Sequence, residues 1–247
     1  MSRVPEPRPA GVPYRIGLIV PSLNATIEPD LYRVSPANFT YHSTRVLLRE
    51  TTPDELRLMN EHLVEAAGLM KTLRPDLLVY ACTSGSFIDG WDALDSQMHA
   101  LSVAVSRPVI ATSQAAVDAI EHLGIRRLAL ATPYVPVVTA LESVFLEQRG
   151  LQVVSVRELG LSGEEIRDVP VGAVFDLALA ADCAEADAVF ISCTDLAAME
   201  IIQTLEDRLA KPVLTSNQVT LWAILRSCGW TGAVEGHGQL LADVGAA

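Results

Sequence analysis

Two cysteines have the residue type and the surroundings for chemistry on a small molecule. Cys82 ends the apolar run "VYAC" and Cys193 ends "VFISC", 111 residues later, and each is followed by a threonine. A free thiol has a pKa of about 8.5, which nearby hydrogen-bond donors can lower. One thiolate can then act as nucleophile or base while a second, protonated thiol acts as acid. Both cysteines could instead be small apolar core residues, but a matched pair favours catalysis.

The segments around the cysteines alternate between apolar strands and amphipathic helices. Strands are expected over 14–21, 40–48, 76–85, 108–113, 126–134, 151–159, 187–195 and 211–217. Helices are expected over 22–34, 52–73, 92–105, 137–150, 172–185, 196–210 and 218–229. This alternation is typical of an α/β protein with parallel, doubly wound sheets.

The second half of the chain repeats the strands of the first half in order. The offsets are 112, 111 and 104 residues, and they join 15–21 to 127–133, Cys82 to Cys193, and 107–114 to 211–218. A nearly constant offset indicates an internal duplication. We therefore predict two similar lobes related by a pseudo-two-fold axis, each with a mainly parallel four-stranded sheet flanked by helices.

The duplication also predicts where the lobes begin and end. Residues 1–13 are expected to form a flexible tail, 14–113 plus 218–247 the first lobe, and 114–217 the second. Ligands of parallel α/β sheets bind at the carboxyl ends of the strands. We therefore expect Cys82 and Cys193 to face one cleft from opposite lobes, each just before a helix N-terminus. Cys183 and Cys228 lack counterparts and are interpreted as packing residues.

Composition excludes several classes of partner. A formal charge of −12 argues against nucleic acid and anionic membranes. The N-terminal stretch "MSRVPEPRPAGVP" lacks the apolar core of a signal peptide, and no run is long enough to span a membrane. Four cysteines without a signal peptide favour free thiols and a cytoplasmic location. The spacing of cysteines and of the five histidines predicts no metal site.

Several of these segments resemble a known family. "YRIGLIVPSLNATIEPDL", "FTYHSTRV", "VYACTSGS" and "ATPYV" are similar to the aspartate/glutamate racemase superfamily, within it to the branch of maleate cis-trans isomerases and arylmalonate decarboxylases. The resemblance covers residues 14 to about 240 and is most specific over 20–28. It implies an isomerase that needs no cofactor. Cys82 would add as thiolate to a cis-dicarboxylate such as maleate, Cys193 would protonate the neighbouring carbon, and the single bond would rotate before the thiolate leaves.

The resemblance also implies which residues bind the substrate. Asn24 and Tyr134 would hold it from the two lobes, although Asn24 could instead cap a helix and Tyr134 could be a buried aromatic with a satisfied hydroxyl. A homo-oligomer, dimer or tetramer, is expected from the family and from apolar helices such as 221–230. The hydroxyls and amides expected to bind oxyanions are those of Ser22, Thr83, Ser84 and Thr194.

Three stretches of the sequence depart from the isomerase pattern. The first motif reads Ser-Leu-Asn-Ala-Thr over 22–26, where isomerases carry Ser-Ser-Asn-Thr-Thr. Glu164 stands where the family isomerase places an asparagine that binds substrate, so it is either a solvated loop residue or the mark of a substrate with an amine or amide. The segment after Cys193 reads Thr194-Asp195-Leu196, where isomerases have apolar or amide residues.

Other functions use the same parts. An amino-acid or hydantoin-type racemase would remove a proton with one thiolate and return one from the other thiol. An arylmalonate-type decarboxylase needs only the second cysteine and a small residue in place of Cys82, so the two thiols count against it. A two-lobed binding protein would close on a small ligand without reacting with it. Thiol alkylation distinguishes such a binding protein from an enzyme, because it would abolish turnover in an enzyme and need not affect ligand binding.

Overall fold

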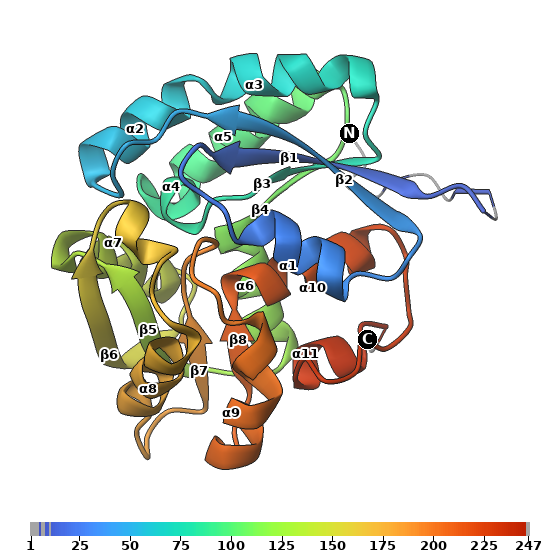
Figure 1. Ribbon diagram of the computed structural model, residues 1–247. Coiled ribbons are helices and arrows are strands. Elements are labelled where there is room, and N and C mark those ends of the chain that lie inside the picture. Colours follow the sequence, from blue (N-terminus) through green and yellow to red (C-terminus); the bar gives the residue numbers. More distant parts are fainter. Residues whose placement is uncertain (1–4, 6–7, 10, 246–247) are drawn as a thin grey trace.

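Two parallel sheets form the framework of the computed structural model, which describes residues 5, 8–9 and 11–245. The first sheet has the order β2-β1-β3-β4 and the second the order β6-β5-β7-β8, with all neighbouring strands parallel (Figure 1). The shared order confirms the prediction of two similar α/β lobes. The strands are β1 (Tyr14–Pro21), β2 (Phe39–Val46), β3 (Leu77–Tyr80), β4 (Val109–Ala111), β5 (Arg127–Tyr134), β6 (Gln152–Leu161), β7 (Ala188–Ile191) and β8 (Val213–Thr215).

The central strands are apolar along their length because helices cover both faces of each sheet. All four residues of β3 and all four of β7 are buried. β3 pairs with β1 with Leu18 opposite Val79, and β7 pairs with β5 with Leu130 opposite Phe190. Each short central strand ends two residues before its cysteine, so both cysteines leave the carboxyl edge of a sheet.

An acidic residue six positions before each cysteine fixes the other end of these strands. The Asp76 carboxylate accepts the Arg15 N–H at 2.8 Å, and the Asp187 carboxylate accepts the Arg127 N–H at 2.8 Å. Each bond ties the beginning of a central strand to the beginning of its neighbour. The repeated aspartates are therefore part of the framework and lie at the edge opposite the cysteines.

The predicted helices occur in the expected order but not with every predicted length, and the helices over 112–122 and 239–242 were not predicted. The expected helix over 52–73 is interrupted at His62, and the expected helix over 196–210 begins only at Ile202. The α-helices are α1 (Ile27–Val34), α2 (Pro53–Glu61), α3 (Leu63–Met70), α4 (Thr83–Phe87), α5 (Gly90–Val105), α6 (Thr112–His122), α7 (Pro136–Glu147), α8 (Val171–Ala181), α9 (Ile202–Leu209), α10 (Ser216–Ser227) and α11 (Gln239–Ala242). Single 3₁₀ turns occur at Lys71–Leu73, Glu164–Ile166 and Met199–Ile201.

Helices α6 and α10 pack against each other in the middle of the molecule (Figure 1). The apolar residues of α10, including Leu221, Trp222 and Leu225, are buried in the core of the same chain. This burial does not test the subunit contact that the sequence suggested for this helix, and the homo-oligomer stays a prediction. The predicted boundary after residue 113 falls within α6, and the lobe boundaries stay a prediction.

The predicted tail over residues 1–13 lies in large part outside the described residues. Where the chain is described, Arg8 makes a two-pronged ion pair with Asp76, with contacts of 2.8 and 2.6 Å. Across the described part of the chain, none of the helices has the length and apolar character that a membrane span needs.

Candidate active site

Cys82 occupies the turn between β3 and α4. Its extended backbone (φ −144°, ψ 116°) makes it the N-cap residue of α4, and its sulfur accepts the Gly85 N–H at 3.3 Å. The Ser84 hydroxyl lies 3.7 Å from the same sulfur. Two donors therefore surround the Cys82 sulfur, and donors of this kind favour a thiolate over a thiol.

Cys193 occupies the corresponding turn after β7 but in a different backbone conformation. Its φ of +104° lies where residues other than glycine are rare and strained. The expectation of a helix directly after both cysteines is therefore wrong for Cys193, because this φ turns the chain out of the helical direction. Its N–H donates to the Ser216 hydroxyl at 2.9 Å, and its sulfur accepts the Asp195 N–H at 3.4 Å.

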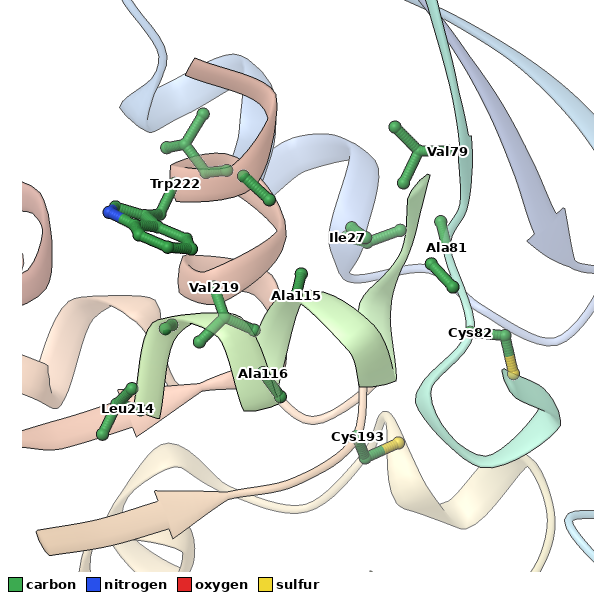
Figure 2. Close-up of a cluster of buried hydrophobic side chains, with 14 of the residues drawn as sticks. Ile27, Val79, Ala81, Cys82, Ala115, Ala116, Cys193, Leu214, Val219 and Trp222 are labelled. Carbon is green, nitrogen blue, oxygen red and sulfur yellow. The ribbon is translucent and has the colours of Figure 1, made fainter. Parts of the chain in front are cut away.

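The two cysteines line one small cavity at the carboxyl edges of the two sheets. Figure 2 shows their sulfur atoms directed toward the same region from separate segments, beside a cluster of buried apolar side chains. The cavity holds about 20 Å³, which is room for one water molecule, so a larger ligand requires outward movement of its walls. Its lining is Pro21, Leu23, Asn24, Leu48, Thr51, Cys82, Ser84, Tyr134, Gly163, Ile166, Cys193, Thr194 and Asp195.

The surroundings make the two thiols unequal acids. Burial raises the pKa of both, and the Gly85 N–H and the Ser84 hydroxyl partly offset that effect at Cys82. The pKa of Cys193 is raised further, because the Asp195 carboxylate adds its charge to the effect of burial. Cys82 is therefore the thiol that ionises more easily, and Cys193 the one that keeps its proton.

Asn24 binds the beginning of α1 and also contacts the other half of the chain. Its side-chain oxygen accepts the N–H groups of Thr26 and Ile27 at 3.0 and 3.1 Å, which caps the start of α1. Its side-chain nitrogen donates to the Thr194 hydroxyl at 3.0 Å. Because the oxygen is occupied by the cap, the amide must present its NH₂ group to the cavity, and a second N–H remains for a ligand oxygen.

Tyr134 carries an unsatisfied hydroxyl in the cavity wall. The side chain is fully buried, and within the described part of the chain its oxygen makes no hydrogen bond of ordinary geometry. Buried polar groups without a partner are rare in native proteins. Its proximity to Cys193 lowers the pKa of that thiol. The Tyr134 hydroxyl thus has the Cys193 sulfur as its polar neighbour and makes no hydrogen bond of ordinary geometry with the described residues, which leaves it available to a ligand.

Three predicted site residues lie outside the cavity lining. The Ser22 hydroxyl exchanges two hydrogen bonds with the backbone of Leu48, at 3.0 and 3.1 Å. Thr83 is buried and donates to the Ser216 hydroxyl at 2.8 Å. Glu164 is exposed and pairs with Arg167 at 3.0 Å. Ser22 and Thr83 thus position neighbouring segments, and the outward direction of Glu164 agrees with its interpretation as a solvated loop residue.

Several residues of the site were not selected from the sequence. Ser216 bridges the two halves, since its hydroxyl contacts both Thr83 and the Cys193 N–H. Tyr80 is buried and bonded to Asn60 at 2.6 Å, and its hydroxyl lowers the pKa of Cys82. The two-residue period of a strand places Tyr80 on the side of Cys82 and could have indicated it. No comparable signal marks Ser216.

The Asp195 carboxyl also belongs to the cavity wall and gives it a negative charge. Burial raises its pKa, while the donors of Ala25 and Thr26 oppose that effect. Among the described residues, the lining contains no lysine, arginine or histidine. No group of three potential metal ligands occurs in the ranges that the structure describes. The chemistry available from this chain is therefore that of two thiols, surrounded by hydroxyl and amide donors and one carboxylate.

Comparison with known proteins gives these features a family context. The sequence profile of the arylmalonate decarboxylase family matches residues 16–241. The maleate isomerase of Nocardia farcinica is 29% identical over 242 residues, which cover 92% of this chain and 95% of the relative.

Two solved structures extend the likeness to the fold. A cysteine-to-alanine variant of the maleate isomerase from Pseudomonas putida with maleate has a TM-score of 0.88 at 26% identity, covering 93% of this chain and 98% of the other. A cysteine-to-serine variant of the Nocardia farcinica maleate cis-trans isomerase has a TM-score of 0.85 at 28% identity, with the same coverage. The latter carries a covalently bound succinylcysteine intermediate. These likenesses confirm the branch that the sequence motifs indicated.

Proposed function

Because the chain belongs to the arylmalonate decarboxylase family, we propose that it is a cofactor-independent cis-trans isomerase of a small alkene carboxylate of the maleate type. The observation that carries this proposal is the pair of cysteines, Cys82 and Cys193, in the wall of one cavity. A binding protein has no need of two buried thiols facing one ligand. The likeness to maleate isomerases selects the type of reaction.

Each thiol has one role in the reaction. The Cys82 thiolate adds to one carbon of the double bond, and the electron pair of that bond moves toward the neighbouring carboxylate. The Cys193 thiol gives its proton to the neighbouring carbon and becomes a thiolate. After rotation about the new single bond, the Cys193 thiolate takes the proton back and the Cys82 sulfur leaves with its electron pair. Both thiols return to their first states, and only the alkene geometry has changed.

The unequal acidity of the thiols supports this assignment. Cys82 has the Gly85 N–H and the Ser84 hydroxyl near its sulfur, whereas Cys193 has the Asp195 carboxylate as a neighbour. Burial opposes a negative charge on both sulfurs, the two donors partly offset that effect at Cys82, and the Asp195 carboxylate adds to it at Cys193. The nucleophile is therefore placed at Cys82 and the acid at Cys193.

Neutral donors are available for the charge that develops on the substrate. The free N–H of Asn24 and the Tyr134 hydroxyl both belong to residues of the lining. Donors fixed before the reaction stabilise an enolate-like anion without reorganising, and this is usually the largest contribution to catalysis. The cap on α1 holds the Asn24 amide in the required direction.

The succinylcysteine of the Nocardia farcinica variant supports addition of a thiol over the alternatives. This group is the product expected from adding a cysteine S–H across the double bond of maleate. A decarboxylase needs one thiol and gives no role to Cys82. A racemase removes a proton next to a carboxylate and forms no bond between carbon and sulfur.

The assembly and location are part of the same proposal. We place the protein in the cytoplasm as a homo-oligomer, a dimer or tetramer. Exposed apolar side chains on α2 and α3, those of Leu58, Val64 and Leu69, support a subunit contact on that face.

Proton NMR of the purified protein with maleate in D₂O tests the proposed reaction. We expect conversion to fumarate, and a loss of at least about 1000-fold in Cys82→Ala and in Cys193→Ala, because each variant lacks one partner of the proton and sulfur transfer. The control is Cys183→Ala, which removes a thiol that does not line the cavity. No conversion of the alkene, with solvent deuterium entering an amino acid at Cα instead, would reject the isomerase and support a racemase.

A further inference from the structure

One oxygen of the Asp195 carboxylate accepts hydrogen bonds from the protein, and the other accepts none from the described residues. Oδ1 accepts the Ala25 N–H at 2.7 Å and the Thr26 hydroxyl at 3.1 Å. Oδ2 receives no hydrogen bond from the described residues, although the residue is more than nine-tenths buried and lines the cavity. An acceptor left unused on a residue of the lining can take a donor from a ligand that fills the cavity.

The charge of Asp195 is not neutralised within the lining. Arg167 is the basic side chain whose charge lowers the pKa of Asp195. Its guanidinium already donates to the Leu23 carbonyl and to Glu164, both at 3.0 Å, and it does not line the cavity. A substrate with two carboxylates would bring two further negative charges into a buried site that contains this one. Like charges in a desolvated site are strongly unfavourable.

The remaining polar groups suit a single carboxylate. Asn24 and Tyr134 offer an N–H and an O–H to the cavity, and both are uncharged. The site therefore complements a ligand with one carboxylate and one uncharged donor. A primary amide has the shape of a carboxylate, carries two N–H groups, and withdraws electrons from the double bond as thiolate addition requires. An ammonium group would also pair with Asp195, but it would not activate the alkene.

We propose that Asp195 makes this enzyme selective for the half-amide of a cis-butenedioic acid, whose amide N–H donates to Asp195 Oδ2 while the neutral donors hold the carboxylate. The inference rests on the proposed function, since it names the substrate class of the same site. It assigns to Asp195 a specificity role and leaves the thiol chemistry unchanged.

Asp195→Asn tests the inference with the smallest possible change. The Ala25 N–H keeps an oxygen at the Oδ1 position, so the new NH₂ group takes the place of Oδ2 and offers a donor to the substrate. We expect the wild-type protein to isomerise maleamate with a kcat/KM about 10- to 100-fold above that for maleate. The variant should reverse the preference by a similar factor. Asp168→Asn, an exposed carboxylate after the 3₁₀ turn at Glu164–Ile166, should keep the wild-type ratio.

Binding of the saturated analogues separates recognition from reaction. By isothermal titration calorimetry, succinamate should bind the wild-type protein at least about 10-fold more tightly than succinate, and Asp195→Asn should reverse that order. Equal or tighter binding of succinate by the wild-type protein, or a ratio unchanged in the variant, would overturn the inference even if maleate is isomerised. Preferred binding of succinamate without turnover of either alkene would support the role of Asp195 and reject the proposed reaction.

Discussion

At the scale of single residues, the two thiols of the cavity differ in acidity because their immediate neighbours differ. Cys82 accepts a backbone N–H within a short helical turn, and Cys193 lies beside a carboxylate on a strained backbone. A φ of +104° at a residue that is not glycine costs about 1–3 kcal/mol. The backbone of Cys193 is held in that state by its bond to the Ser216 hydroxyl.

A second buried carboxyl lies behind Cys193 and affects stability. Glu142 on α7 accepts the Ser192 hydroxyl at 2.5 Å, and its other oxygen has no partner in the part of the chain that the structure describes. Burial raises the pKa of Glu142 to about 8. A carboxyl with a raised pKa adds its full stability only below about pH 4.5, and that stability is lost as the pH rises through 8.

Glu142→Gln should therefore stabilise the protein at neutral and alkaline pH. The variant keeps an acceptor for Ser192 and removes the cost of protonating the buried carboxyl on folding, which is on the order of 3 kcal/mol at pH 7. Thermal or urea unfolding at pH 5 and pH 8 measures the difference, which should grow with pH. Glu147→Gln, exposed on the same helix, should show no such growth. A destabilised Glu142→Gln at pH 8 would mean that the ionised carboxylate is needed by the fold.

Residue patterns led to the two cysteines and to four other residues of the lining, Asn24, Ser84, Tyr134 and Thr194, but not to Tyr80 or Ser216. The repeated Cys-Thr after apolar strands was sufficient to select Cys82 and Cys193. Asp195 was noticed only as a departure from the family, because nothing in the residue types shows that the chain turns at Cys193. The partnership of Ser216 with Thr83 joins residues 133 positions apart, and such a contact depends on how the two sheets are packed.

At the scale of elements, α4 carries Cys82 and is held in place by an unusually close approach. A Cβ added to Gly85 would lie 2.0 Å from the Tyr80 hydroxyl and 2.6 Å from a methyl carbon of Met59. Tyr80 cannot move freely, because it donates to Asn60, and Asn60 in turn donates to the Gly85 carbonyl. Only glycine allows α4 to come this near to the strand before it.

Gly85→Ala should consequently damage both stability and activity. The methyl group must displace α4 or Tyr80, at a cost of about 1–3 kcal/mol in unfolding free energy. The Gly85 N–H that lowers the pKa of Cys82 would move with it, so turnover should fall by more than the loss of folded protein explains. Gly68→Ala in α3, where a Cβ meets nothing within 4 Å, provides the control and should be neutral or slightly stabilising. Wild-type activity in Gly85→Ala would contradict the role given to α4.

Most strands and helices were predictable in order and type, but α6 and the interruptions of the predicted helices were not. The apolar spacing over 52–73 continues through the break at His62, so the periodicity of the sequence predicts a single helix there. After Cys193 the residues read as helical, yet Asp195 instead bonds to Ala25 and Thr26 in the other half of the chain. Tertiary contacts outweighed local helix propensity at that point.

At the scale of the whole molecule, the duplication explains why one cavity has two thiols. Equivalent strands in the two sheets end at the same kind of turn, and the packing of the sheets brings those turns together. The sequence repeat predicted two similar units, but it did not show which surfaces meet. Polar contacts across the cavity, such as that of Asn24 with Thr194, hold the halves in register.

Two loops close the cavity over the cysteines. The Thr51 N–H donates to the Ser162 carbonyl at 2.6 Å, which joins the loop after β2 to the loop after β6. Leu48, Thr51, Gly163 and Ile166 from these loops belong to the lining. The two loops that the Thr51–Ser162 hydrogen bond joins therefore form part of the cavity wall.

Trapping the covalent adduct tests the central claim most directly, namely that Cys82 adds to the alkene and Cys193 supplies the proton. Cys193→Ser is incubated with maleate and, separately, with maleamate, and the modified residue is identified by intact-mass and peptide mass spectrometry. We predict one ligand added per chain, on Cys82, and no adduct in the matched Cys82→Ser variant. An adduct on Cys183 or Cys228 alone, or none on Cys82 with either ligand, would contradict the two-thiol mechanism.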